Sequence, residues 1–218
     1  MNKRTYRIIP FIIILMSLAS QGAAQAPPKE VTEAANKGLS AYLNKIPPDQ
    51  AQEFGFSKDD RFVECYLGNP LQLHTISPSA LSKYQPGDTL GSIMSSTKMW
   101  YFPVMLGDEA KAILVIDQVD NRWQAVSFGY AELARKVTRV RKRWPKVKGY
   151  NPQLIAVFQT REYLFTIPEK GPDNLTSLES TQLGRIPPKT VKDFSELDNL
   201  PNVINRLRPL VQKSIRSK

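Results

Sequence analysis

The sequence is poor in the residues that build disulfides and metal sites. Its 218 residues include one cysteine, Cys65, and one histidine, His74. A single cysteine cannot form a disulfide within the chain, so the fold has to rest on its hydrophobic core. The same counts exclude zinc sites made from two cysteines or two histidines of one chain. We therefore expect neither a metal ion nor a cofactor.

Long hydrophobic runs are also missing. The longest covers residues 8–19 (IIPFIIILMSLA), and a membrane-spanning helix needs about 20 residues. A short basic segment precedes the run, and the small residues Ser20, Gly22, Ala23 and Ala24 follow it. Positive charge, a short apolar core and small residues, in that order, are typical of a secretory signal peptide.

We predict that residues 1–24 are this signal peptide and that cleavage follows Ala24. The protein is then exported, either to the periplasm or as a secreted protein. Without cleavage, the same segment would tether it to the membrane. Residues 1–24 carry three cations and no acid, so their removal lowers the net charge from +10 to about +7. Residues 25–30 contain Pro27-Pro28 and are interpreted as a linker, and residues 31–218 as one domain.

Hydrophobic periodicity predicts most of the elements in that domain. Apolar residues at helical spacing predict a helix over residues 30–45, and a capping pattern predicts a short one from Ser57 to Gly68. Residues 71–76 are expected to form a strand, and residues 78–99 a long loop with a helical turn at residues 79–83. Alternating runs joined by Gly107-Asp108 and Asp120-Asn121 predict a three-stranded antiparallel meander over residues 100–106, 110–118 and 122–128.

The second half of the domain is expected to hold a helix, two more strands and a last helix. These cover residues 130–143, 154–160, 163–167 and the region around 203–211, with an irregular, proline-containing segment at residues 168–200. The pattern predicts an α+β fold with a single antiparallel sheet of about five to six strands and helices packed on one face. A helix followed by a meander is similar to the layout of small exported domains of the cystatin-like kind. This is an analogy of layout, and fold alone does not give function.

One tetrapeptide has the spacing of a catalytic serine and lysine. In Ser95-Ser96-Thr97-Lys98, a helix would place Ser95 and Lys98 on one face, where the lysine could assist deprotonation of the serine. The segment runs directly into the strand expected at Trp100, and the companion Lys-Thr-Gly motif is absent. These features favour a polar loop before a strand.

Cys65 and His74 form the second catalytic candidate. A thiol beside an imidazole is a nucleophile with its base. The nine residues between them say nothing about their distance in space, and a small buried thiol is common in proteins. Neither pair is assigned as catalytic.

The densest charge in the chain is a basic segment of residues 135–148. It holds eight cations and no acid, and an apolar stripe runs through it from Ala131 to Trp144. Such a helix can dock on an anionic membrane surface or an acidic polymer. If the stripe packs on the sheet, the cations form a solvated face instead. The residues predicted to bind an anion or partner are Arg135, Arg139, Arg141, Lys142, Arg143, Lys146 and Lys148.

These observations favour a non-enzymatic binding or accessory protein that acts at the cell envelope or outside the cell. Its expected partner is a macromolecule or an envelope component. Nucleic acid is not expected, because export removes the protein from most of it and no aromatic RNA-binding strand motif is present. One alternative is an inhibitor or chaperone-like partner of a secreted enzyme, and another is a hydrolase that uses Ser95 and Lys98 or Cys65 and His74.

Overall fold

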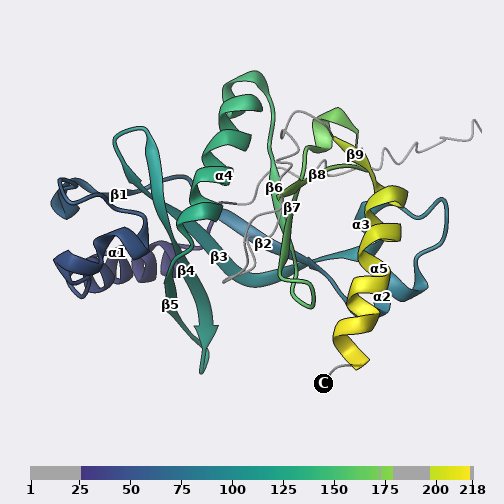
Figure 1. Ribbon diagram of the computed structural model, residues 1–218, viewed down its shortest axis with the longest axis horizontal. Helices are drawn as coiled ribbons and strands as arrows, with labels where there is room; N and C mark the ends of the chain where they lie inside the picture. The colour runs from purple at the N-terminus through teal and green to yellow at the C-terminus, as the bar shows by residue number, and fades with distance from the viewer. Residues whose placement is uncertain (1–25, 172, 179–196, 217–218) are drawn as a thin grey trace, which may run out of the picture.

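The described chain forms one large open sheet with helices on both faces (Figure 1). The computed structural model describes residues 26–171, 173–178 and 197–216. The expected signal peptide, residues 1–24, lies outside the described residues, as do residues 179–196 of the segment expected to be irregular. None of the helices in the described ranges is both long and apolar enough to cross a membrane.

Nine strands make up the sheet within the described ranges: β1 (Tyr66–Leu67), β2 (Leu71–Ile76), β3 (Met94–Leu106), β4 (Glu109–Val119), β5 (Arg122–Gly129), β6 (Gln153–Val157), β7 (Glu162–Thr166), β8 (Asn174–Leu178) and β9 (Asp198–Asn199). The α-helices are α1 (Lys29–Leu43), α2 (Pro78–Lys83), α3 (Leu90–Ile93), α4 (Ala131–Arg143) and α5 (Leu200–Arg216). Four 3₁₀ turns complete the description: η1 (Pro48–Phe54), η2 (Phe62–Glu64), η3 (Lys146–Lys148) and η4 (Pro168–Lys170).

The strand order is β5-β4-β3-β2-β6-β7-β8-β9, with β1 paired to β3. The β3–β4–β5 meander is closed by tight turns, and Asp120 and Asn121 adopt the left-handed φ values of 49° and 60° that such hairpin turns require. All neighbouring strands are antiparallel except β2 and β6, which run parallel. A parallel pair needs a long crossover, which here contains the whole meander and α4.

Helix α1 covers one face of the meander. Its buried side comprises Val31, Ala34, Ala35, Gly38 and Leu43, the spacing expected for one face of a helix. These residues pack in one cluster with Trp100, Phe102, Leu114 and Ile116 of the strands. Because successive strand residues point to opposite faces, their neighbours Tyr101, Ile113 and Val115 lie on the other face.

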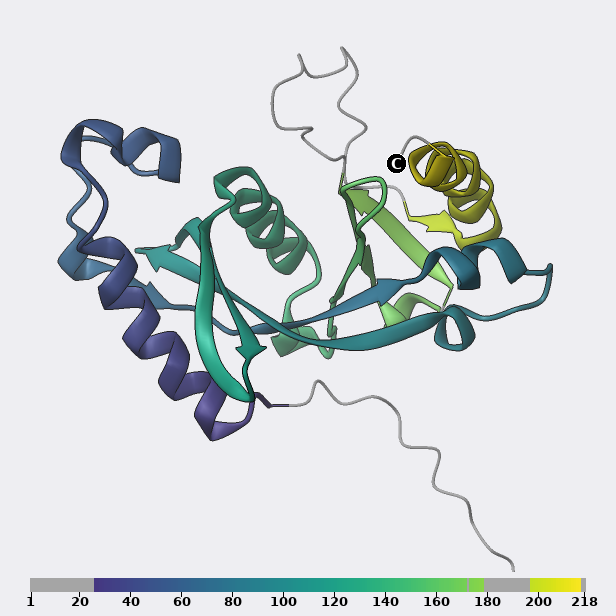
Figure 2. The same cartoon turned by 90° about the horizontal axis from the view of Figure 1, so that it is seen from below.

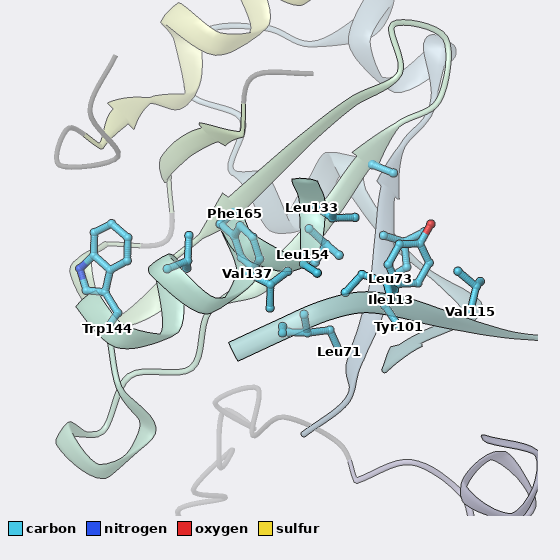
Figure 3. Packing of buried hydrophobic residues seen from close by; sticks show 14 of the residues in the cluster. Leu71, Leu73, Tyr101, Ile113, Val115, Leu133, Val137, Trp144, Leu154 and Phe165 are labelled. Atoms are coloured by element: carbon cyan, nitrogen blue, oxygen red, sulfur yellow. The ribbon is translucent and has the colours of Figure 1, made fainter. Parts of the chain in front are cut away.

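Helix α4 packs on that other face, at the centre of the sheet (Figure 3). Gly129 and Tyr130 have φ values of 126° and 55°, so the chain reverses sharply between β5 and α4. The helix buries Leu133, Ala134, Val137 and Val140 against β2, β3, β4, β6 and β7. It ends at Arg143, just before Trp144-Pro145, because proline cannot continue the helical hydrogen bonds.

Helices α2 and α5 cover the far half of the sheet, on the same face as α1. Ile76, Ile155 and Leu164 belong to their cluster, whereas the alternate residues Leu73 and Leu154 pack under α4. Figure 2 shows α1 and α5 at the two ends of the sheet with α4 between them. On the same face, Gln72, His74 and Ser96 of β2 and β3 are polar and not fully buried.

The α+β class is confirmed, and several finer expectations need correction. The sheet has nine strands where five to six were expected, it contains one parallel pair, and helices cover both faces. Within the expected loop of residues 78–99, α2 matches the expected helical turn at residues 79–83, whereas α3 and the start of β3 were not expected. In place of the short helix expected from Ser57, the chain forms only the η2 turn and β1. The expected irregular segment contains η4, β8 and β9, since pairing with β7 supplies β8 with partners that no local pattern shows.

Candidate anion-binding site

The apolar stripe of the basic segment packs on the sheet. Ala134 and Val140 are fully buried and Val137 is 1 % exposed, so the stripe offers no free apolar surface to a membrane. The cations of α4 therefore divide between solvent and the protein. Lys136 is buried, and its ammonium lies 3.8 Å from the carboxylate of Glu132.

The seven predicted binding residues do not form one uniform face. Arg135 donates to Glu132 at 2.8 Å and is exposed, as are Arg139, Lys142 and Arg143. The Arg143 guanidinium lies 5.4 Å from the ring centroid of Trp144. Lys146 and Lys148 are exposed in η3. Only Arg141 of the seven is half-buried, and it lies beside a cleft with Lys146 nearby.

The cleft opens at the N-terminal ends of the parallel strands β2 and β6 and has a volume of about 460 Å³. It is lined by Arg141 at the end of α4, by residues between 144 and 153, and by Gln72, His74 and Ser96 of the sheet. Its aromatic lining consists of Trp100, Trp144 and Tyr150. No aspartate or glutamate is among the lining residues. The size lies in the range of pockets that hold small molecules.

Arg141 is the strongest charge in this cleft. Its Nη2 donates a long hydrogen bond of 3.3 Å to the backbone oxygen of Pro70. Within the described ranges, no carboxylate lies within ion-pair distance of Arg141. Burial lowers the pKa of the guanidinium to about 10, which leaves it charged at neutral pH. A charged, half-buried guanidinium without a counter-ion has lost part of its hydration and gained little compensation.

Carboxamides form the second chemical element of the cleft. Asn69, Gln72, Asn151 and Gln153 all line it. The Gln72 amide donates to the Thr97 backbone oxygen at 3.2 Å. The side chains of Asn69, Asn151 and Gln153 make no hydrogen bond to another described residue. Each of these groups carries both donors and an acceptor that remain available to a ligand.

His74 and Ser96 also line the cleft. The Nδ1 of His74 lies 3.2 Å from the Ser96 Oγ, across the β2–β3 pairing. Burial lowers the pKa of His74 below its ordinary value of 6.5, so the ring is neutral at pH 7. In the described part of the chain, no carboxylate hydrogen-bonds the other ring nitrogen, as a Ser-His-Asp arrangement requires.

The structure separates the two pairs considered from the sequence. Ser95 and Lys98 both lie in strand β3, so the helical spacing on which that idea depended is absent. Lys98 Nζ instead donates to Gln118 Oε1 at 2.7 Å. Cys65 packs at the edge of the cluster under α1, whereas His74 pairs with Ser96. Burial raises the pKa of the Cys65 thiol, and the charges of Asp60 and Glu64 add to this effect, whereas Lys111 opposes it.

The sequence predicted Arg141 and Lys146 as binding residues. It did not predict that the four carboxamide residues, His74 and Ser96 would line the same cleft. These residues come from segments about 25 to 80 positions apart in the chain, so no local motif could reveal them.

No group of three or more histidine, cysteine, aspartate or glutamate side chains suited to a metal ion occurs within the described ranges. Comparisons with protein-family models, curated proteins and solved structures find no match to this chain.

Proposed function

We propose that this protein is an exported, non-enzymatic binding protein that holds an acidic polymer at the cleft beside the end of α4. The observation that carries the proposal is Arg141, a charged guanidinium that is half-buried in the cleft without a carboxylate partner in the described chain. An anionic ligand would supply the missing counter-charge through strong, charge-assisted hydrogen bonds. Lys146 lies at the same opening and extends the positive field to the surface.

Between the two anionic partners predicted from the sequence, the polymer has more support than the membrane. A helix that lies on a membrane inserts its apolar face, and the apolar face of α4 is buried on the sheet. Within residues 131–150, Val147 is the one large exposed apolar residue, at 94 % exposure, and it lies in η3 and not in α4. The exposed residues Lys142, Arg143 and Lys148 lie close in the chain to the lining residues Arg141 and Lys146, and their charges suit the repeated charges of an extended polymer.

Export is part of the proposal and rests on the sequence of residues 1–24. It places the cleft where acidic polymers of the envelope or the exterior are available. The cystatin-like layout remains an analogy between α1 over the meander and other small exported domains, and it adds no functional argument.

The test measures binding of the purified protein to polygalacturonate and to vesicles that contain phosphatidylglycerol. We expect polymer binding that weakens as salt is raised from about 50 to 500 mM, because screening reduces electrostatic attraction. Arg141→Gln should weaken it about tenfold, the effect of losing roughly 1.4 kcal/mol. Arg122→Gln removes an equal charge from the exposed start of β5 and should change binding less than about twofold.

Equal effects of the two substitutions would refute the role of Arg141. Binding to vesicles alone would refute the choice of a polymer, and absence of binding to both probes would refute the proposal as a whole.

A hydrolase is the second candidate, favoured by the 3.2 Å contact between His74 and Ser96 in the cleft. In that case a fluorophosphonate probe should label Ser96 in the folded protein, and His74→Gln should abolish the label. We expect no labelling, because no acidic group orients the imidazole within the described chain. Labelling that depends on both residues would replace the binding proposal with an enzymatic one.

A further inference from the structure

We infer that the ligand of the cleft is an acidic sugar, a uronate unit whose carboxylate pairs with Arg141 and whose hydroxyls bind the carboxamides. This inference rests on the proposed function and narrows it to one chemical class. It follows from three features of the cleft: the charge of the cations, the number of free carboxamides and the position of the cleft at the C-terminal end of α4.

The carboxamides determine the neutral part of the ligand. A simple anion needs only cationic donors, whereas three side chains here hold unused donors and acceptors: Asn69, Asn151 and Gln153. A sugar hydroxyl is both a donor and an acceptor, as is a carboxamide, so neighbouring hydroxyls complement such a set. Ser96 and Gln72 add a hydroxyl and a further amide oxygen to the lining of the cleft.

The aromatic residues supply apolar lining to the cleft. Trp100 and Trp144 are 4 % and 6 % exposed, so they offer no open stacking surface to a sugar ring. Tyr150 is half-buried, and the Lys170 ammonium lies 5.3 Å from its ring centroid. The cleft therefore combines apolar aromatic residues with a few polar groups, as do sites that orient a small ligand.

The end of α4 favours a carboxylate over a phosphate. Phosphate sites commonly use the N-terminus of a helix, where free N–H groups and the positive end of the dipole face the anion. Here the C-terminal turn of α4 borders the cleft, and its free carbonyl groups carry partial negative charge. That field opposes a doubly charged phosphate more than a singly charged carboxylate, and Arg141 can bind the carboxylate with two parallel hydrogen bonds.

The experiment compares three soluble probes: trigalacturonate, the neutral maltotriose and inorganic phosphate. Binding is followed by calorimetry and by tryptophan fluorescence, because Trp100 and Trp144 line the cleft. We expect trigalacturonate to bind and to displace polygalacturonate, with maltotriose and phosphate at least about tenfold weaker. Arg141→Gln should weaken trigalacturonate about tenfold or more, and Asn151→Ala and Gln153→Ala about threefold to tenfold each.

Asn36→Ala, an exposed carboxamide of α1, is the matched control and should leave binding unchanged. Polymer binding without trigalacturonate binding, equal binding of phosphate, or no effect of Asn151→Ala and Gln153→Ala would each overturn the uronate inference and leave the proposed function standing. If polygalacturonate also fails to bind, the proposed function fails with it.

Discussion

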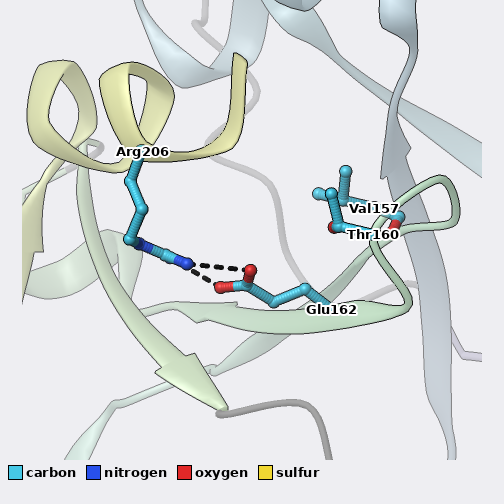
Figure 4. Close-up of polar contacts among 4 residues, drawn as sticks. All are labelled: Val157, Thr160, Glu162 and Arg206. Carbon is cyan, nitrogen blue, oxygen red and sulfur yellow. Dashed lines mark hydrogen bonds and ion pairs between the residues drawn. The ribbon is translucent and has the colours of Figure 1, made fainter. Parts of the chain in front are cut away.

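The Arg206 guanidinium donates two parallel hydrogen bonds to the Glu162 carboxylate, at 2.8 and 2.6 Å (Figure 4). Glu162 begins β7 and is 6 % exposed, whereas Arg206 comes from the middle of α5. The pair fixes the last helix to the far half of the sheet at one defined position. A lysine ammonium could not form these two parallel hydrogen bonds to the carboxylate, whereas the planar guanidinium can.

Arg206→Met should lower the free energy of unfolding by about 1.5–3 kcal/mol, because it leaves a nearly buried carboxylate without its main charged partner. Urea unfolding measures the change. The double variant Arg206→Met with Glu162→Met should recover part of the loss, since no uncompensated charge remains. Arg216→Met, in the exposed last turn of α5, is the control and should change stability by less than about 0.5 kcal/mol. Equal losses in Arg206→Met and Arg216→Met would contradict the assignment.

Stability should depend on pH through His74. Burial disfavours the charged imidazole, so the folded protein holds a proton on His74 less tightly than the unfolded chain does. Below the ordinary pKa of 6.5, the unfolded chain gains a proton that the folded protein resists, and the free energy of unfolding falls as pH is lowered. The Arg141 and Lys146 side chains share the cleft, and no acidic lining residue offsets this effect.

The His74 contribution is isolated by comparison with His74→Gln, which cannot titrate. The stability of the wild type minus that of the variant should decrease between about pH 7 and pH 5.5, while carboxylate titrations common to both proteins cancel. A difference that stays constant, or grows as pH falls, would show that the folded state does not disfavour the charged ring.

Gly38→Ala should destabilise the protein although alanine is the better helix former. A Cβ at Gly38 would lie well inside contact distance of the Cβ of Ala125 on β5, so α1 would have to move off the sheet. The overpacking costs about 1–3 kcal/mol, more than the gain of about 1 kcal/mol in helix propensity. Asn36→Ala, at an exposed position of the same helix, should instead be neutral or slightly stabilising.

A compensating variant makes the Gly38 prediction specific. Adding Ala125→Gly to Gly38→Ala removes the clash and should raise the melting temperature above that of Gly38→Ala alone. Failure of this rescue would mean that the approach of α1 to β5 is not the cause of the instability.

Cys65 should react slowly with iodoacetamide in the folded protein. Burial is the largest cause of its raised pKa, and the charges of Asp60 and Glu64 add to it against the opposing charge of Lys111. Little thiolate is therefore present at about pH 7.5, and the rate should be lower than in the urea-unfolded chain and should rise steeply with pH. Glu64→Gln should accelerate the reaction modestly, whereas faster alkylation of the folded wild type would point to an activated thiol.

Local patterns in the sequence were enough for elements whose partners lie next to them in the chain. Strand β2 matches the predicted range of residues 71–76, and the β3–β4–β5 meander follows from alternation and two short turns. The apolar stripe of α4 likewise predicted a helix. Of the two positions considered for this stripe, the structure has the one in which it packs on the sheet. The early start of β3 was missed, because residues 95–98 (SSTK) are all polar and form a strand through pairing with β2.

For the candidate site, the sequence supplied the cations and the tertiary structure selected among them. Arg135 and Arg141 look alike in the sequence, yet one pairs with Glu132 in solvent and the other enters the cleft. The cleft depends on the parallel pairing of β2 with β6, which sets Leu73 opposite Leu154, and the preceding residues Gln72 and Gln153 both line the cleft. No periodicity of a single segment encodes such a contact.

By itself, then, the sequence determined the α+β class, the absence of an internal disulfide, the basic charge and the prediction of export. These depend on composition and on short-range periodicity, which act through each residue and its near neighbours. Only the tertiary structure decided the mixed nine-stranded sheet, the placement of α1 and α4 on opposite faces, and the surroundings of Arg141. The physical reason is that burial and counter-charge are set by segments distant in the chain, which meet only when the strands pair and the helices pack on the sheet.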